Sequence, residues 1–402
     1  MNSKIDAIIK DDLCIGCGLC ESICGRENVE MRLDKTGFFK PEVKNIKPKA
    51  EEVIQRICPG KNIVNQNSYA EEDRIWGSLL NTYSGFYNDE EVRYAGSSGG
   101  FISGLSIYAL EHNMVDAVLQ VGGDTQDYQR NSLRISKTRE DVLRCASSRY
   151  APALIFDKIL SLLNGSSDSY LFVGKPCDIS GLKNFLGEYP QFEDRFKLTV
   201  SILCAGQPSF NGTQQIVDEF KAESPVKNLV YRGNGWPGYF SFDDNLGKHY
   251  KRTYNDSWGS TLNRHLNFRC KICPDGIGLQ ADIAVGDAWE TADGYPDFDE
   301  RDGKSLVMVR THKGQEIVNA ALGSKAVTMN KIAKSDIAVM QPYQDQRRRK
   351  VAARILAYNL YKRRSSVNFV NLNLYSNLRK ESARAVLKEF LGTAKRLYKK
   401  KK

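Results

Sequence analysis

A run of cysteines near the start of the chain is the feature that most constrains its fold. Cys14, Cys17, Cys20 and Cys24 follow the spacing C-x₂-C-x₂-C-x₃-C, with glycines between the first three. A tight loop of this kind points three thiolates at one face of an iron–sulfur cubane, and a distant Cys-Pro pair supplies the fourth. Cys58 directly precedes a proline. The sequence therefore predicts a 4Fe–4S cluster held by Cys14, Cys17, Cys20 and Cys58.

A structural zinc site is the alternative for these cysteines. Zinc usually takes two C-x-x-C pairs, or one such pair with histidines. The first histidine of the chain is His112, far from the run, so a cluster is favoured. Cys24 is the residue left over, and Gly25 follows it where a two-cluster ferredoxin has proline. We interpret Cys24 as a structural thiol, with a ligand of another cluster as the competing reading.

Length and composition indicate a cytoplasmic protein. The 402 residues are 41% hydrophobic, with no apolar run long enough to span a membrane and no apolar core of a signal peptide at the start. Ten cysteines, most of them clustered, are typical of metal or redox sites in a reducing compartment.

The positive charge is concentrated at the C-terminal end. Residues 347–402 hold 18 Lys or Arg against 2 Glu, a charge of +16, so the total of +10 leaves −6 for the rest. This distribution argues against a nucleic-acid-binding protein. Apolar and basic residues alternate at helical spacing after Arg384, which predicts a basic amphipathic helix. We expect it either to pack on the body or to make peripheral contact with the inner membrane surface.

Three regions follow from the pattern along the chain. Residues 1–65 are predicted to form a small ferredoxin-like module, 86–335 an α/β domain that binds the cofactors, and 336–402 a basic helical extension. The overall class is thus α+β with a larger α/β part, because strand-like and helix-like segments alternate after residue 86. Ligands of such domains tend to lie beyond the carboxyl ends of strands. Cys177 and Cys204 follow two predicted strands directly.

Two glycine-rich segments are candidate anion sites, and the sequence favours only the first of them. Ser97, Ser98, Gly99 and Gly100 precede a predicted helix, where free N–H groups favour a phosphate; an ordinary serine cap with a tight turn is the alternative. Residues 233–238 match G-x-G-x-x-G, but Pro237 lies inside the motif and a strand-like segment follows it, which leaves no helix start for a pyrophosphate.

Taken together, these motifs resemble the β-subunit family of deazaflavin-coenzyme-reducing hydrogenases and dehydrogenases. The family includes a plant chlorophyll-derivative reductase and bacterial proteins of surface-polysaccharide gene clusters, and the basic extension favours that bacterial branch. The resemblance runs from about residue 5 to 315. It rests on segments 97–100, 174–177, 203–206, 231–236, 270–273, 281–283 and 286–289.

The resemblance implies FAD as the central cofactor and a second 4Fe–4S cluster beside it. The implied cluster ligands are Cys177, Cys204, Cys270 and Cys273, and Cys145 is then a structural thiol. Flavin contacts are expected from the 97–100 segment. Lys175 and Trp236 are expected to lie near the flavin or its substrate.

The implied electron route runs from a ferredoxin-like donor or deazaflavin coenzyme through both clusters to FAD and a small organic substrate. A role in surface-polysaccharide synthesis is one hypothesis for that substrate. An electron-input subunit without an organic substrate of its own is the competing reading. The four histidines are expected to be structural, and no catalytic residue is assigned.

Overall fold

An eight-stranded sheet forms the centre of the computed structural model, which describes residues 3–66, 70, 73–292, 295–363 and 366–401. In spatial order the strands are β16 (Val327–Lys331), β4 (Asn81–Tyr87), β15 (Ser305–Val309), β12 (Ile283–Asp287), β8 (Phe196–Ile202), β7 (Tyr170–Gly174), β5 (Ala117–Gly122) and β6 (Ser132–Ser136). The neighbours β12, β8, β7 and β5 run parallel, and the outer pairs are antiparallel. The predicted mixed α/β class is confirmed.

Helices cover both faces of this sheet because its strands are apolar on both sides. On β7, Leu171 lies in the core with α5 and α11, whereas Phe172 lies in the opposite core with α8. The covering helices are α4 (Glu90–Ala95), α5 (Phe101–Glu111), α6 (Arg139–Arg144), α7 (Ile159–Gly165), α8 (Pro176–Glu188) and α11 (His312–Gly323). Helix α9 (Phe210–Glu219) packs in a separate core, and the short α10 (Phe268–Lys271) carries Cys270. The carboxyl ends of the parallel strands consequently open on one edge, where the predicted ligands follow.

The C-terminal extension completes one face of the sheet. Leu306 and Met308 of β15 are fully buried in a core that includes Val351 and Ile355 of α13. Its elements are α12 (Lys334–Met340), α13 (Pro342–Lys362), β17 (Asn368–Val370), α14 (Leu374–Leu378) and α15 (Ala383–Lys401). The predicted helices are present, but the strand β17 was not predicted. No helix in the described ranges has the length and apolar composition needed to cross a bilayer.

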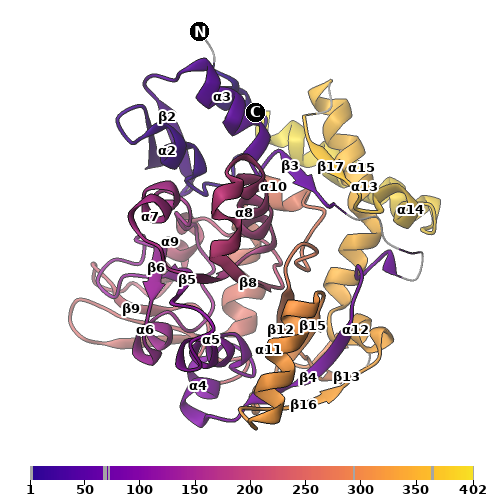
Figure 1. Cartoon of the computed structure of the whole chain (residues 1–402). Helices are drawn as coiled ribbons and strands as arrows, with labels where there is room; N and C mark the ends of the chain where they lie inside the picture. The colour runs from indigo at the N-terminus through magenta and orange to yellow at the C-terminus, as the bar shows by residue number, and fades with distance from the viewer. Residues whose placement is uncertain (1–2, 67–69, 71–72, 293–294, 364–365, 402) are drawn as a thin grey trace.

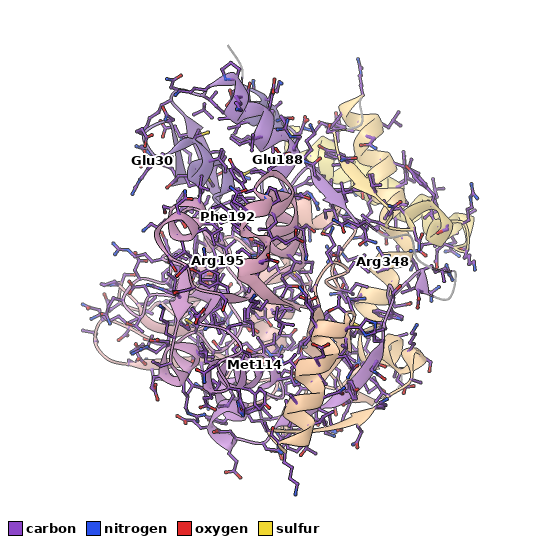
Figure 2. The ribbon with its side chains drawn as sticks, in the orientation of Figure 1. Glu30, Met114, Glu188, Phe192, Arg195 and Arg348 are labelled. Carbon is purple, nitrogen blue, oxygen red and sulfur yellow. The ribbon has the colours of Figure 1, made fainter. Side chains whose placement is uncertain are left out.

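The N-terminal module lies beside this extension, indigo next to yellow at the top of Figure 1. Its elements are α1 (Lys4–Lys10), α2 (Leu19–Cys24), β1 (Val29–Leu33), β2 (Phe39–Val43), α3 (Pro48–Ile57) and β3 (Asn62–Val64). Strand β17 pairs parallel with β3, and the Tyr358 hydroxyl donates to the Asp11 carbonyl at 2.8 Å. Arg56 also pairs with Glu188, labelled in Figure 2, at 2.6 Å. The N-terminal module therefore contacts both the C-terminal extension and the α/β domain.

The smaller elements agree with the sequence where local signals are strong. The helix expected after Gly100 is α5, capped by Gly100 in a left-handed conformation. The G-x-G-x-x-G segment leads into strand β10 (Tyr239–Asp243), which pairs with β9 (Lys227–Val230) and β11 (His249–Thr253). No helix begins there, so rejecting this segment as a dinucleotide fingerprint was correct.

Candidate metal centres

The four cysteines predicted for the first cluster lie together within the N-terminal module. Burial raises the pKa of Cys17 and of Cys20 well above the usual value, and the other thiols of the group add to both shifts. Burial and the neighbouring Cys14 raise the pKa of Cys58 to about 11. The same four residues line an apolar pocket with Ile5 and other side chains. A proton-free thiolate is stable in such a place only if a metal or cluster compensates its charge.

Glycines and backbone amides shape this loop. Gly16 and Gly18 have φ of 73° and 90°, and a Cβ at Gly16 would lie 2.8 Å from the Phe39 carbonyl oxygen. Backbone N–H groups also bond the sulfurs of Cys17 and Cys58 and oppose the rise of their pKa values. Such amides stabilise negative sulfur, which is what an iron–sulfur cluster presents.

Cys24 has different neighbours from the other cysteines of the run. Burial raises its pKa to about 11, and the charges that add to the shift are the carboxylates of Glu27 and Glu51. Its side chain packs against the small core of Ile5 and Val29. These contacts agree with the structural-thiol interpretation.

The four cysteines implied for a second cluster also converge, at the carboxyl edge of the parallel strands. Cys177 lies in the first turn of α8 after β7, and Cys204 follows β8. Burial and the neighbouring Cys270 raise the pKa of Cys204 to about 12, and Cys273 adds to the rise. The Gln207 N–H points at Cys270 Sγ at 3.4 Å. Residues from three distant segments therefore form a second buried thiol group.

Lys175 belongs to this second group. Its Nζ lies 2.8 Å from a carboxylate oxygen of Asp178, whose side chain is buried, whereas that of Lys175 is half-buried. Burial lowers the pKa of Lys175, but Asp178 and the thiolates of Cys177 and Cys204 outweigh it and raise the pKa above its usual value. The predicted contact between Lys175 and a flavin stays a prediction.

A cubane and a single metal ion require different spacings of their ligands. Within the described residues, no three His, Cys, Asp or Glu side chains converge closely enough to ligate one metal ion. Zinc draws its ligands to about 2.3 Å from one centre. In a cubane each thiolate binds a different iron, so the four sulfurs stand farther apart.

Three side chains connect the two thiol groups. Gln207, whose N–H points at Cys270, also donates from its side chain to the Ile15 carbonyl at 3.3 Å. Asn267 donates to the Cys14 carbonyl at 3.1 Å. Arg269 is 1% exposed and donates to the Gly60 carbonyl at 2.5 Å. The loops that carry the two groups are therefore in direct contact.

The segment predicted to bind a flavin phosphate is packed against the sheet. Ser98 Oγ donates to the Lys304 carbonyl at 2.8 Å, and the Gly99 N–H donates to Ser305 Oγ at 3.0 Å. A Cβ at Gly99 would lie 2.6 Å from the Gly85 carbonyl oxygen. Close backbone packing thus accounts for Gly99, and the Ser97 hydroxyl donates to the Arg232 carbonyl at 3.1 Å. The phosphate contact itself stays a prediction.

A buried ion pair lies at the carboxyl end of β12. Arg232 contacts both carboxylate oxygens of Asp287, at 2.9 and 2.5 Å, and Trp236 Nε1 donates to the same carboxylate at 2.8 Å. Trp236 stacks on Trp289 with ring centroids 4.9 Å apart. Gln341 of the extension donates to the Asp287 carbonyl at 2.7 Å. Trp236 is therefore held at the carboxyl end of β12, the kind of position where ligands of α/β domains tend to bind.

Two of the histidines contact neighbouring side chains of the fold, and Cys145 is half-buried. His112 stacks on Tyr108, and His265 bonds Gln215 at 2.8 Å. Burial raises the pKa of Cys145.

Sequence reasoning missed several polar residues around the thiol groups and at the carboxyl end of β12. These are Gln207, Arg232, Asn267, Arg269, Asp287 and Arg347. Arg232 and Asp287 stand inside motifs that carried the resemblance, and Arg269 directly precedes Cys270, so position offered a signal for these three. Arg347 is one of several consecutive cations, and nothing in the sequence separates it from its neighbours.

The chain is similar to several known proteins. The chain is 26% identical to the coenzyme F420 hydrogenase subunit beta of Methanococcus voltae over 61% of its own length and 81% of the relative. It is 24% identical to the coenzyme F420-dependent sulfite reductase of Methanocaldococcus jannaschii over 82% of its length, but spans only 49% of that protein. A chain in the F420-reducing [NiFe] hydrogenase complex of Methanosarcina barkeri has the same fold, with a TM-score of 0.56 and 20% identity over 75% of this chain and 96% of that one.

Two family descriptions match consecutive parts of the chain. Residues 82–160 match the N-terminal part of the coenzyme F420 hydrogenase/dehydrogenase beta subunit, and residues 167–335 match its C-terminal part. Together they cover more than half of the sequence, including Cys177, Cys204, Cys270 and Cys273. The chain belongs to the coenzyme F420 hydrogenase/dehydrogenase beta subunit family.

Proposed function

We propose that this chain is an iron–sulfur flavoprotein oxidoreductase that moves electrons through two 4Fe–4S clusters. The observation that carries the proposal is that two sets of four cysteines, each cysteine buried or half-buried, converge in one fold and are joined by shared polar contacts. The first cluster would be held by Cys14, Cys17, Cys20 and Cys58, and the second by Cys177, Cys204, Cys270 and Cys273. Membership in a redox family supports the same class of activity.

The contact between the two sets supports a transfer path. Gln207 bonds both loops, and the Asp178 carboxylate acts on the pKa of Cys17 as well as on that of Cys177. Each cluster carries one electron at a time, and a flavin accepts electrons singly and releases a pair. A one-electron donor such as ferredoxin would then reach the flavin through both clusters.

We propose FAD as the flavin and a deazaflavin coenzyme as a redox partner. The relatives are named for coenzyme F420, which supports the coenzyme assignment. The flavin would lie at the carboxyl edge of the sheet, between the second cysteine set and the Trp236–Trp289 stack. A substrate of surface-polysaccharide synthesis stays a hypothesis.

A second candidate is an electron-input subunit with no organic substrate of its own. The solved chain with the same fold belongs to a hydrogenase complex, which favours this reading. The two candidates share the clusters and differ only in what receives the electrons.

The experiment is metal, flavin and spectroscopic analysis of the full chain prepared without oxygen. We expect about eight irons per chain and two four-iron signals by electron paramagnetic resonance after reduction. Extraction should release FAD, and reduced coenzyme F420 should bleach the protein. An iron content near four, or stoichiometric zinc, would contradict the proposal. Reoxidation by small organic acceptors supports the enzyme, and reoxidation only by a partner protein supports the input subunit.

The basic helix α15 carries a separate proposal of peripheral membrane contact. It packs on α13 through Thr393 and Leu397, whereas Leu387, Leu391 and Tyr398 are exposed. Cations near an anionic surface contribute roughly 1 kcal/mol each. We expect the chain to sediment with anionic vesicles at low salt and to be released at high salt.

The matched control keeps α13 intact, because truncation before Arg347 would also remove part of the core. Replacing the exposed Lys388 and Lys395 by glutamate should abolish sedimentation without changing the melting temperature. If both forms stay in the supernatant at low salt, α15 has no membrane role.

A further inference from the structure

Arg347 of α13 binds the backbone of three of the four cysteines in the second set. Its guanidinium donates to the carbonyls of Cys204 at 3.0 Å, Cys270 at 2.9 Å and Cys273 at 3.2 Å. The side chain is 3% exposed. A planar guanidinium with five fixed donors suits such a convergence of acceptors from two separate loops.

The charge of Arg347 lies at the loops that carry three of the four thiols. The groups that act on it most are the thiols of Cys273, Cys204 and Cys270 and the hydroxyl of Tyr343. A guanidinium stays positive in proteins, and at low dielectric the field of a buried cation acts on nearby groups with little screening.

The other cations near the sulfurs act on both cysteine sets, are paired with a carboxylate, or belong to the first set. Arg269 acts on Cys58 as well as on Cys270, so it affects both sets. The charge of Lys175 is offset by Asp178, 2.8 Å away. The first set has its own cation in Lys40, which donates to the Cys14 carbonyl at 2.9 Å but is only half-buried. Arg347 is the buried cation whose hydrogen bonds go to cysteines of the second set.

We propose that Arg347 raises the reduction potential of the second cluster above that of the first and so directs electrons from the N-terminal module toward the sheet. The inference rests on the proposed function, because it requires a cluster at the second set. Reduction adds one electron, and hence one negative charge, to that cluster. A fixed buried cation stabilises the added charge, and charge and hydrogen bonds around a cluster set its potential.

Arg347 also lies outside residues 82–160 and 167–335, which match the family. The tuning would therefore be supplied by the C-terminal extension. The proposal would give Arg347, one of several consecutive cations in α13, a function other than surface charge. Arg348, the next residue and labelled in Figure 2, is equally buried but donates to the carbonyls of Ile75, Pro274 and Leu372.

The test is a redox titration of the full chain followed by electron paramagnetic resonance, with a Cys17→Ser background to assign the second-cluster signal. In Arg347→Gln we expect the ratio of reduced to oxidised second cluster at the wild-type midpoint to fall about tenfold, which is about 59 mV for one electron. Arg347→Lys should restore most of the potential. The first cluster should keep its midpoint in both variants.

Two further variants separate tuning from packing. Arg348→Gln removes an arginine that is also buried but donates to only one carbonyl beside the second set, that of Pro274, so it should shift the second midpoint much less than Arg347→Gln does. Gln344→Glu keeps Arg347 and adds a carboxylate beside it, because Gln344 also donates to the Cys204 carbonyl, at 3.1 Å. It should lower the second potential even if Arg347→Gln does not fold.

Unchanged second-cluster midpoints in Arg347→Gln and Gln344→Glu would overturn the inference. An equal shift in Arg348→Gln would overturn it too, since packing would then be the cause. If wild-type protein shows no second cluster at all, the proposed function itself has failed, and iron analysis identifies that case before any variant is made.

Discussion

Cys17→Ser should lower the iron content from about eight to about four per chain and leave the second cluster signal intact. Cys17 is buried among Cys14, Cys20 and Cys58, and serine is a poor ligand for iron because its oxygen is hard and protonated. The ligands of the second set lie on other segments and keep their own contacts. Iron analysis and paramagnetic resonance of the reduced protein measure both effects.

Two cysteine variants serve as matched controls for this result. Cys24→Ser and Cys145→Ser each remove one thiol from a site with other neighbours, carboxylates for Cys24 and arginines for Cys145. Both should retain about eight irons. Loss of iron in Cys24→Ser would make that residue a ligand, and loss of all iron in Cys17→Ser would mean that the two sets do not assemble separately.

Asp287→Ala should destabilise the protein by about 3–5 kcal/mol, because it leaves the Arg232 guanidinium buried without its partner. Arg232 is 3% exposed, and burial lowers its pKa while Asp287 more than compensates and raises it. The substitution also removes the acceptor of the Trp236 Nε1–H. Chemical unfolding of the metal-free chain measures the loss.

The control for this effect is an ion pair at the surface. Glu290 contacts Lys304 at 2.7 Å, and both side chains are about two-fifths exposed. Glu290→Ala should cost at most about 1 kcal/mol, since exposed pairs contribute little. Equal losses in Asp287→Ala and Glu290→Ala would show that Arg232 is compensated by other groups or by water.

The extension has a structural role whatever its part in tuning or membrane contact. Its charge of +16 suggested a separate basic tail. In the structure, the guanidinium groups of Arg347 and Arg348 donate hydrogen bonds to carbonyls inside the protein. Val351 and Ile355 pack in the core against β15. Net charge counts residues without regard to burial, so it does not separate a solvated cation from one that holds a loop.

The sequence alone determined the local parts of the candidate sites. Cysteine spacing predicted the first set because one short loop positions Cys14, Cys17 and Cys20, and glycines at fixed places allow it to turn. Alternating apolar segments predicted the strands after which Cys177 and Cys204 stand, because each strand end fixes the residue that follows.

Only the tertiary structure decided how the distant parts meet. Cys270 and Cys273 were assigned to the same cluster as Cys177 only through the family resemblance, because no local spacing relates segments so far apart. The pairing of β17 with β3 and the bonds of Gln207 to both thiol groups have no periodic signal in sequence. Arg347 reads as a surface cation until α13 packs against the sheet, because burial is a property of the folded chain.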